Sequence, residues 1–166
     1  GLDRGRIDLD YVFVGVGPDR EDVYGYGLLL MQDANVSASK IMQRIFELLD
    51  LSERNPLTMS DGLAVFSTRG GRITFQQGQV SNRLAAILVE PGGWTDILDK
   101  TVDLYVVAVP LKTVQSVLQQ IPVVKVFVGF KDKLYRVRVE GHYADSSDNL
   151  VRKEVLTDIK EGLAQG

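Results

Sequence analysis

The sequence predicts a mainly β domain of the α+β class, with a curved antiparallel sheet or groove and two short amphipathic helices. Apolar and polar residues alternate in segments such as 7–13 and 134–142, which is typical of strands with one buried face. Turn-forming pairs such as Gly70-Gly71 separate the apolar segments. Connections this short join antiparallel neighbours, so we expect hairpins rather than long crossovers.

The predicted strands begin with a hairpin over residues 6–33, whose turn is signalled by Gly17-Pro18-Asp19. Asp61-Gly62 and Gln77-Gly78 are predicted breaks between later strands. Those later strands are expected at residues 63–68, 72–75, 80–90, 101–109, 123–130 and 134–142.

Two segments have helical periodicity. The first helix is expected at residues 39–51, capped by Ser37 or Ser39, with an apolar stripe of Ile41, Ile45, Leu48 and Leu49 and with Lys40 and Arg44 on the other face. The second is expected at residues 111–120 and ends before Pro122. We interpret residues 1–153 as a single β-rich domain and residues 154–166 as a tail or marginal helix.

The strand centres carry more apolar surface than one sheet with a wet face needs, because segments 84–89 and 104–109 are apolar on both faces. Two alternatives follow: the sheet closes into a sandwich or barrel, or one apolar face stays open for a ligand or partner. If a face stays open, the candidate lipid-groove or interface residues are Leu84, Ala86, Leu88, Leu104, Tyr105, Val106, Val107 and Ala108.

Composition excludes several classes of function. The chain has 166 residues, a formal net charge of −3 and no cysteine, which argues against a nucleic-acid-binding protein and excludes disulfides and thiolate metal sites. His142 is the single histidine, and Asp8 and Asp10 are interpreted as a solvated strand face rather than a catalytic dyad. We therefore predict no catalytic, cofactor or metal site.

Two basic segments are candidate anion-binding surfaces. Arg69-Gly70-Gly71-Arg72 could form an anion nest, although a glycine turn flanked by solvated arginines is the favoured interpretation. Residues 122–153 hold seven Lys or Arg against four acidic residues, which could face lipid headgroups or a partner, although ordinary charged residues on an outer face are the favoured interpretation. The candidate residues in that segment are Lys131, Lys133, Arg136 and Arg138.

The order of several segments resembles the AsmA-like C-terminal domain of large bacterial envelope proteins. The segments are "G-R-I-D-L-D", "G-Y-G-x-L-x-x-x-D-A-N-V", "L-A-V-F-S-T-R-G-G-R-I-T-F", "V-S-N-R-L-A-A-I-L-V-E-P-G-G-W-T-D" and "V-D-L-Y-V-V-A-V-P", followed by "I-P-V-V" and "Y-R-V-R-V-E-G-H-Y-A-D". The likeness covers roughly residues 5–145. Where that family has "D-P" after its final strand, this chain has Ala144-Asp145-Ser146-Ser147.

The resemblance implies a non-enzymatic domain of a periplasmic protein, anchored to the inner membrane in its full-length form. Its apolar β-groove would carry phospholipid or another envelope lipid toward the outer membrane. The alternative is a structural or assembly module of the cell envelope that binds a partner protein through its apolar face. The chain is interpreted as part of a longer protein.

Overall fold

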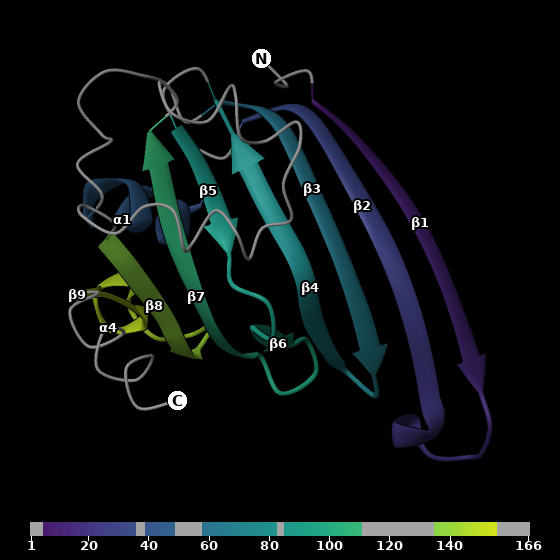
Figure 1. Ribbon diagram of the computed structural model, residues 1–166. Helices are drawn as coiled ribbons and strands as arrows, with labels where there is room; N and C mark the ends of the chain where they lie inside the picture. Colours follow the sequence, from purple (N-terminus) through teal and green to yellow (C-terminus); the bar gives the residue numbers. More distant parts are fainter. Residues whose placement is uncertain (1–4, 36–38, 49–57, 83–84, 111–134, 156–166) are drawn as a thin grey trace, which may run out of the picture.

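The computed structural model describes residues 5–35, 39–48, 58–82, 85–110 and 135–155. They form one nine-stranded antiparallel sheet (Figure 1), which confirms the mainly β fold class. The strand order is β1-β2-β3-β4-β5-β7-β8-β9, and the short β6 pairs with β4 and β7. The strands are β1 (Arg6–Gly15), β2 (Val23–Asn35), β3 (Thr58–Arg69), β4 (Arg72–Ser81), β5 (Ala85–Val89), β6 (Trp94–Asp96), β7 (Thr101–Pro110), β8 (Tyr135–His142) and β9 (Val151–Val155).

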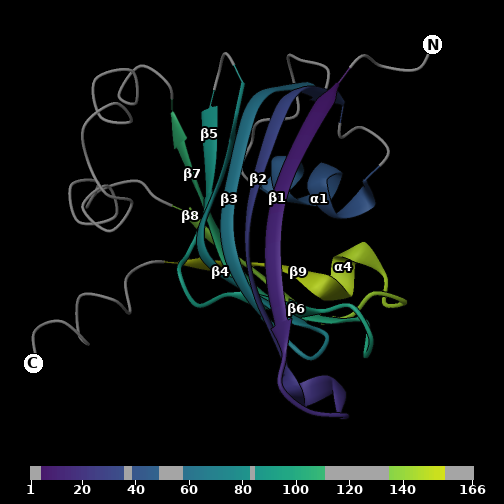
Figure 2. The same cartoon turned by 90° about the vertical axis from the view of Figure 1, so that its right-hand side faces the viewer.

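In the described part of the chain three short helical segments accompany the sheet: η1 (Arg20–Asp22), α1 (Lys40–Leu48) and α4 (Ser147–Leu150). The hydroxyl of Ser39 accepts a hydrogen bond from the backbone N–H of Met42, so Ser39 caps α1 as the sequence predicts. Figure 2 shows α1 and α4 on the same side of the sheet. We call this side the helix face.

The hydrophobic core lies between the helix face and α1 with α4, and it is concentrated under β5, β7, β8 and β9. Ile45 and Phe46 of α1 are buried there, although the predicted stripe did not include Phe46. Every second residue of β8 points toward the helices, so the strands supply most of the remaining buried side chains of this core. The other buried members of the core are Ile87, Val102, Val106, Val137, Val139, Leu150 and Val151.

The other side of the sheet carries Arg69, Arg72, Arg136 and Arg138, and we call it the arginine face. The strand register places all four on the same face of the sheet. Arg69 pairs with Arg72, β6 pairs with both β4 and β7, and β7 pairs with β8, which carries Arg136 and Arg138. As predicted for residues 134–142, valines and charged residues alternate along β8 between the two faces.

Several predicted boundaries are wrong. Asp61-Gly62 lies inside β3, and Gln77-Gly78 lies inside β4. The register shifts between Val65 and Phe66 of β3, which leaves Gln76 of β4 as an extra residue without ending the strand. The predicted strand 80–90 is divided, since β4 ends at Ser81 and β5 begins at Ala85.

The C-terminal part also differs from the expectation. Residues 147–155 form α4 and then β9, so the predicted end of the domain at residue 153 falls inside a strand. Leu150 and Val151, each 2% exposed, provide the burial in this polar segment that periodicity did not reveal. The predicted helix 111–120 and the predicted strand 123–130 lie outside the described residues.

Candidate functional site

A hollow of about 570 Å³ opens on the arginine face, between η1, the β3–β4 hairpin and the loop after β6. Aromatic, hydroxyl and charged side chains line it together. We call it the arginine hollow because three of the lining residues are Arg20, Arg69 and Arg72. Its volume lies within the roughly 300–1,000 Å³ of small-molecule sites.

Arg69 and Arg72 flank a tight turn and lie directly opposite each other across the β3–β4 ladder. Gly70 takes a φ of +62° in that turn, which glycine adopts without steric penalty. Like charges directly opposite each other destabilise an antiparallel pair. This arrangement therefore gathers positive charge at a local cost in stability.

Each of these two arginines stacks on an aromatic ring. The guanidinium carbon of Arg69 is 5.0 Å from the centroid of Tyr24, and that of Arg72 is 4.0 Å from the centroid of Trp94. Stacking contacts of this kind are attractive and hold the guanidinium planes. Neither arginine forms an ion pair with a described residue, so their N–H groups can still donate to an anion.

Asp96 lies at the wall of the hollow and is 8% exposed. One carboxylate oxygen accepts hydrogen bonds from the backbone N–H groups of Asp99 and Leu98, both at 3.0 Å. The N–H of Asp99, then that of Leu98 and the charges of Arg72 and Arg20, hold the pKa of Asp96 below its ordinary value against the effect of burial. Asp96 is thus an ionised structural group that fixes the loop after β6.

The third arginine, Arg20, belongs to an exposed ion pair. Its Nε atom is 3.1 Å from a carboxylate oxygen of Glu21, and both side chains are more than half exposed. An exposed pair of this kind contributes little to stability. Arg20 is therefore a peripheral member of the hollow, and Arg69 and Arg72 are its principal cations.

An apolar surface begins at the hollow and continues along the outermost strands of the arginine face. We call it the apolar strip. Tyr26 and Val12, which pair across β1 and β2, are 73% and 72% exposed. Residues two apart on a strand share a face, so β2 continues the strip away from the hollow. Its members are Val12, Val14, Tyr24, Tyr26, Leu28 and Leu30.

The eight residues predicted to line an open apolar face lie elsewhere, and four of them are buried. Ala86, Leu88 and Val107 are each 1% exposed and Val106 is 3% exposed. Val106 and Val107 point to opposite faces of β7 and both are buried, so of the two alternatives the closed one fits the centre of this strand. Leu104 and Tyr105 are partly buried, Leu84 lies outside the described residues, and β7 includes Ala108, whose side chain is among those left undescribed.

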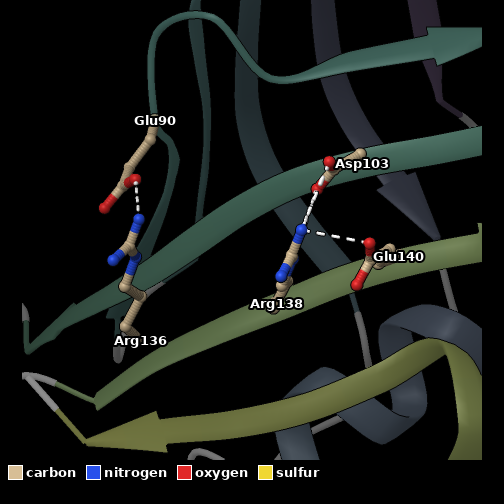
Figure 3. Close-up of polar contacts among 5 residues, drawn as sticks. All are labelled: Glu90, Asp103, Arg136, Arg138 and Glu140. Carbon is tan, nitrogen blue, oxygen red and sulfur yellow. Dashed lines mark hydrogen bonds and ion pairs between the residues drawn. The ribbon is translucent and has the colours of Figure 1, made fainter.

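The predicted headgroup-facing arginines of β8 are held in ion pairs (Figure 3). Arg136 lies 2.9 Å from Glu90, while Arg138 contacts Asp103 at 3.3 Å and Glu140 at 3.1 Å. Both guanidinium groups also lie over the ring of Tyr105, with Arg136 at 3.4 Å from the centroid. The hydrogen bond from Arg138 to Asp103 raises the pKa of Arg138 above its ordinary value.

Two of the three acids in this network are remote in the sequence: Glu90 follows β5 and Asp103 belongs to β7, so counting charges along residues 122–153 could not reveal them. The third, Glu140, lies two residues from Arg138 on β8. Lys131 and Lys133, the other two predicted basic residues, lie outside the described part of the chain.

The structure does not bring Asp8, Asp10 and His142 together. Asp8 is on β1, where it pairs with Arg6 at 2.8 Å, and Asp10 follows it on the same strand. His142 ends β8, and its Nδ1 accepts a hydrogen bond from the backbone N–H of Ala144. Strands β2, β3, β4, β5 and β7 separate β1 from β8.

Sequence reasoning missed the apolar strip, although a signal was present. In Tyr24-Gly25-Tyr26-Gly27 large rings alternate with glycines, which shows that one face of this segment is built for aromatic side chains and the other for close approach. The paired arginines at the β3–β4 turn were recognised as a possible anion nest, and the structure adds the aromatic rings and the hollow beside them.

Comparison with protein families, curated proteins and solved structures finds no match for this chain. In the described residues, no helix combines the length and apolar character needed to cross a membrane. No group of three or more His, Asp or Glu in the same part of the chain is placed to hold a metal ion.

Proposed function

We propose that this chain is a non-enzymatic lipid-contacting module, which holds a phospholipid with its phosphate in the arginine hollow and an acyl chain on the apolar strip. The pairing of Arg69 with Arg72 is the observation that carries the proposal. These two like charges lie opposite each other at the end of the apolar strip, in a hollow that is also lined by Glu21, Asp96 and Asp99. A phosphate between them would replace repulsion with charge-assisted hydrogen bonds.

The dimensions of the apolar strip are consistent with this ligand. From Tyr24 to Leu30 the strand advances six residues at about 3.4 Å each, which gives roughly 20 Å. One leaflet contributes about half of the ~30 Å hydrocarbon core of a bilayer, so an acyl chain laid along β2 stays on the strip. The phosphate would then lie beside Tyr24, at the end of the strip nearest the hollow.

The cellular setting is part of the proposal and depends on the likeness to AsmA-like domains. In that setting the module is a C-terminal part of a periplasmic protein that is anchored to the inner membrane, and it assists phospholipid transport toward the outer membrane. The site differs from the one expected from sequence, because the proposed lipid surface lies on β1 and β2 instead of β5 and β7.

Binding of a fluorescent phosphatidylglycerol by the 166-residue chain tests the headgroup and the acyl parts separately. The double variant Arg69→Gln/Arg72→Gln should weaken binding about tenfold or more, since it removes the two cations that stack on Tyr24 and Trp94. The conservative double variant with lysine at both positions should retain part of the affinity, because charge remains while the bidentate geometry is lost.

The acyl part is tested by placing a charge on either side of the sheet. Tyr26→Asp puts a carboxylate on the apolar strip, whereas Phe13→Asp puts one on the helix face at a similarly exposed position, 64% against 73%. The proposal requires that Tyr26→Asp abolish uptake and that Phe13→Asp leave it nearly unchanged. Equal effects, or a reversed order, would show that the arginine face is not the lipid surface.

A further inference from the structure

Strand β1 forms one edge of the sheet (Figure 2). All ten of its residues, Arg6–Gly15, are exposed. Natural edge strands are usually short, bulged, covered, or protected by charged side chains, especially lysine, or by proline. β1 is long, its pairing with β2 has no register shift, and it contains neither Lys nor Pro; its charged residues are Arg6, Asp8 and Asp10.

The direction of the backbone groups of β1 follows from two hydrogen bonds near its end. The N–H of Val16 donates to the carbonyl of Asp22 at 3.1 Å, so Val16 faces β2. The carbonyl of Val23 accepts from Gly70 on the β3 side, so Val23 and its partner Gly15 do not bond each other. In an antiparallel ladder these orientations alternate.

The even residues of β1 therefore bond to β2, and the odd residues direct both N–H and C=O outward from the sheet. Five residues present these groups at the open edge. They are Ile7, Leu9, Tyr11, Phe13 and Gly15. Four of them, Ile7, Leu9, Tyr11 and Phe13, place their side chains on the helix face, while Asp8, Asp10, Val12 and Val14 place theirs on the arginine face.

We propose that β1 pairs antiparallel with β1 of a second copy of this chain, with the two-fold axis between the two Tyr11 residues. In this register Leu9 lies opposite Phe13 and Ile7 opposite Gly15, so all five outward residues find a partner. On the arginine face Asp10 lies opposite Val12, and Asp8 lies opposite Val14. No like charges meet in this arrangement.

Neighbouring registers are poorer. A shift that brings Asp10 opposite its own copy repels and leaves one outward residue unpaired, because like charges directly opposite are unfavourable. A shift centred on Leu9 sets Asp8 against Asp10 twice. A shift centred on Val12 has no charge conflict but leaves Ile7 unpaired. The self-complementary sequence of the strand thus favours a second copy, joined by the closed two-fold contact that is common among homo-oligomers.

Both faces of the sheet remain free in such a dimer, so this inference does not depend on lipid binding. On the helix face the ring of Tyr11 lies over β2, where its hydroxyl bonds Thr68 and the ring stacks on Phe66 at 6.2 Å. The ring of Phe13, whose centroid is 5.7 Å from that of Tyr11, would lie opposite Leu9 of the second copy.

Sedimentation equilibrium of the 166-residue chain at about 100 μM should give the mass of a dimer. Leu9→Pro should give a folded monomer, because it removes one outward N–H and none directed at β2. Leu9→Ala, the matched control, keeps that N–H and should remain dimeric at this concentration. A monomeric parent chain, or a Leu9→Pro variant that is folded and still dimeric, would overturn the proposal.

The absence of cysteine from the chain makes a second test direct. Paired residues of a hydrogen-bonded antiparallel ladder have Cα atoms about 5.5 Å apart, within the range of a disulfide. Tyr11→Cys should therefore form an intermolecular disulfide under mild oxidation. Asp10→Cys and Val12→Cys should crosslink far more slowly, since in this register each lies two residues away from its own copy. Faster crosslinking at position 10 or 12 would exclude the proposed register, and failure at all three positions would exclude the strand pairing.

Discussion

Replacing Gly27 with alanine should destabilise the domain, because an aromatic ring packs directly against this glycine. Gly27 pairs with Phe66 across β2 and β3, and Phe66 is 9% exposed. A Cβ atom at position 27 would lie 2.5 and 2.8 Å from the Cε2 and Cε1 atoms of Phe66, far inside contact distance. The ring would have to move away from the strand.

The expected size follows from two opposing effects. Overpacking of a well-packed site costs about 1–3 kcal/mol. Alanine also reduces the freedom of the unfolded chain, which offsets this by about 0.4–1 kcal/mol. The free energy of unfolding of Gly27→Ala should therefore fall by about 1–2 kcal/mol. Urea unfolding followed by circular dichroism measures this as a lower midpoint with an unchanged slope.

Gly15→Ala is the matched control on the neighbouring strand. A Cβ atom there would meet only Val23, at 4.0 Å, which is an ordinary contact. We expect Gly15→Ala to be neutral or stabilising by up to about 1 kcal/mol. Combining Gly27→Ala with Phe66→Leu should recover part of the loss, since the smaller side chain leaves room for the new methyl group. If both glycine variants have the same midpoint, the ring does not rest on Gly27 and the reasoning is refuted.

Three further predictions concern the core and the hollow. Val106→Asp and Val107→Asp should both lose the strand signal in circular dichroism, because each side chain is buried and an unpaired carboxylate there costs several kcal/mol; one folded variant would show an open face. Ile45→Asp should lower the free energy of unfolding by several kcal/mol, whereas Arg44→Ala should lower it by about 0.5–1 kcal/mol, since its ion pairs are partly exposed; similar losses would show that the faces of α1 are misassigned. Asp96→Asn should be less stable than the parent by about 1 kcal/mol at pH 7, because the charge-assisted hydrogen bonds are weakened. The depressed pKa of Asp96 means that its contribution is present above the unfolded pKa and is lost as pH falls through the folded pKa, so the two stability curves should converge in acid; parallel curves would contradict the assignment.

Alternation in the sequence predicted the strands correctly where one face of a strand is exposed to solvent. In β8, alternation alone separated buried Val137 and Val139 from Arg136 and Arg138. It was insufficient where glycine has a packing role. Gly62 and Gly78 were interpreted as breaks because glycine is common in turns, but both lie within long strands. A Cβ at Gly62 would meet Met31 and Val80, so this glycine admits neighbouring side chains.

The candidate site shows the same limit. Local sequence identified the arginine pair at the β3–β4 turn, because both residues flank one glycine dipeptide. The aromatic rings that stack on these arginines, those of Tyr24 and Trp94, come from β2 and β6, and only the fold places them beside the pair. Conversely, the sequence left open whether the apolar run in β7 lines a ligand surface or a closed core, because periodicity cannot distinguish an open apolar face from one that other parts of the protein cover.

The distribution of burial gives the two proposals a common physical basis. The described core residues gather under α1 and α4, around β5, β7 and β8, whereas Val12 of β1 and Tyr26 of β2 are more than 70% exposed. A sheet gains stability when an apolar face is covered by another layer. At β1 and β2 the described residues leave apolar side chains exposed on both faces and backbone groups unpaired at the edge. A lipid on the arginine face would bury apolar side chains without satisfying the edge, and a second β1 would satisfy the edge without covering that face. The two therefore complete different parts of the same exposed region, and a monomeric variant such as Leu9→Pro that still binds phospholipid would show that they are separable.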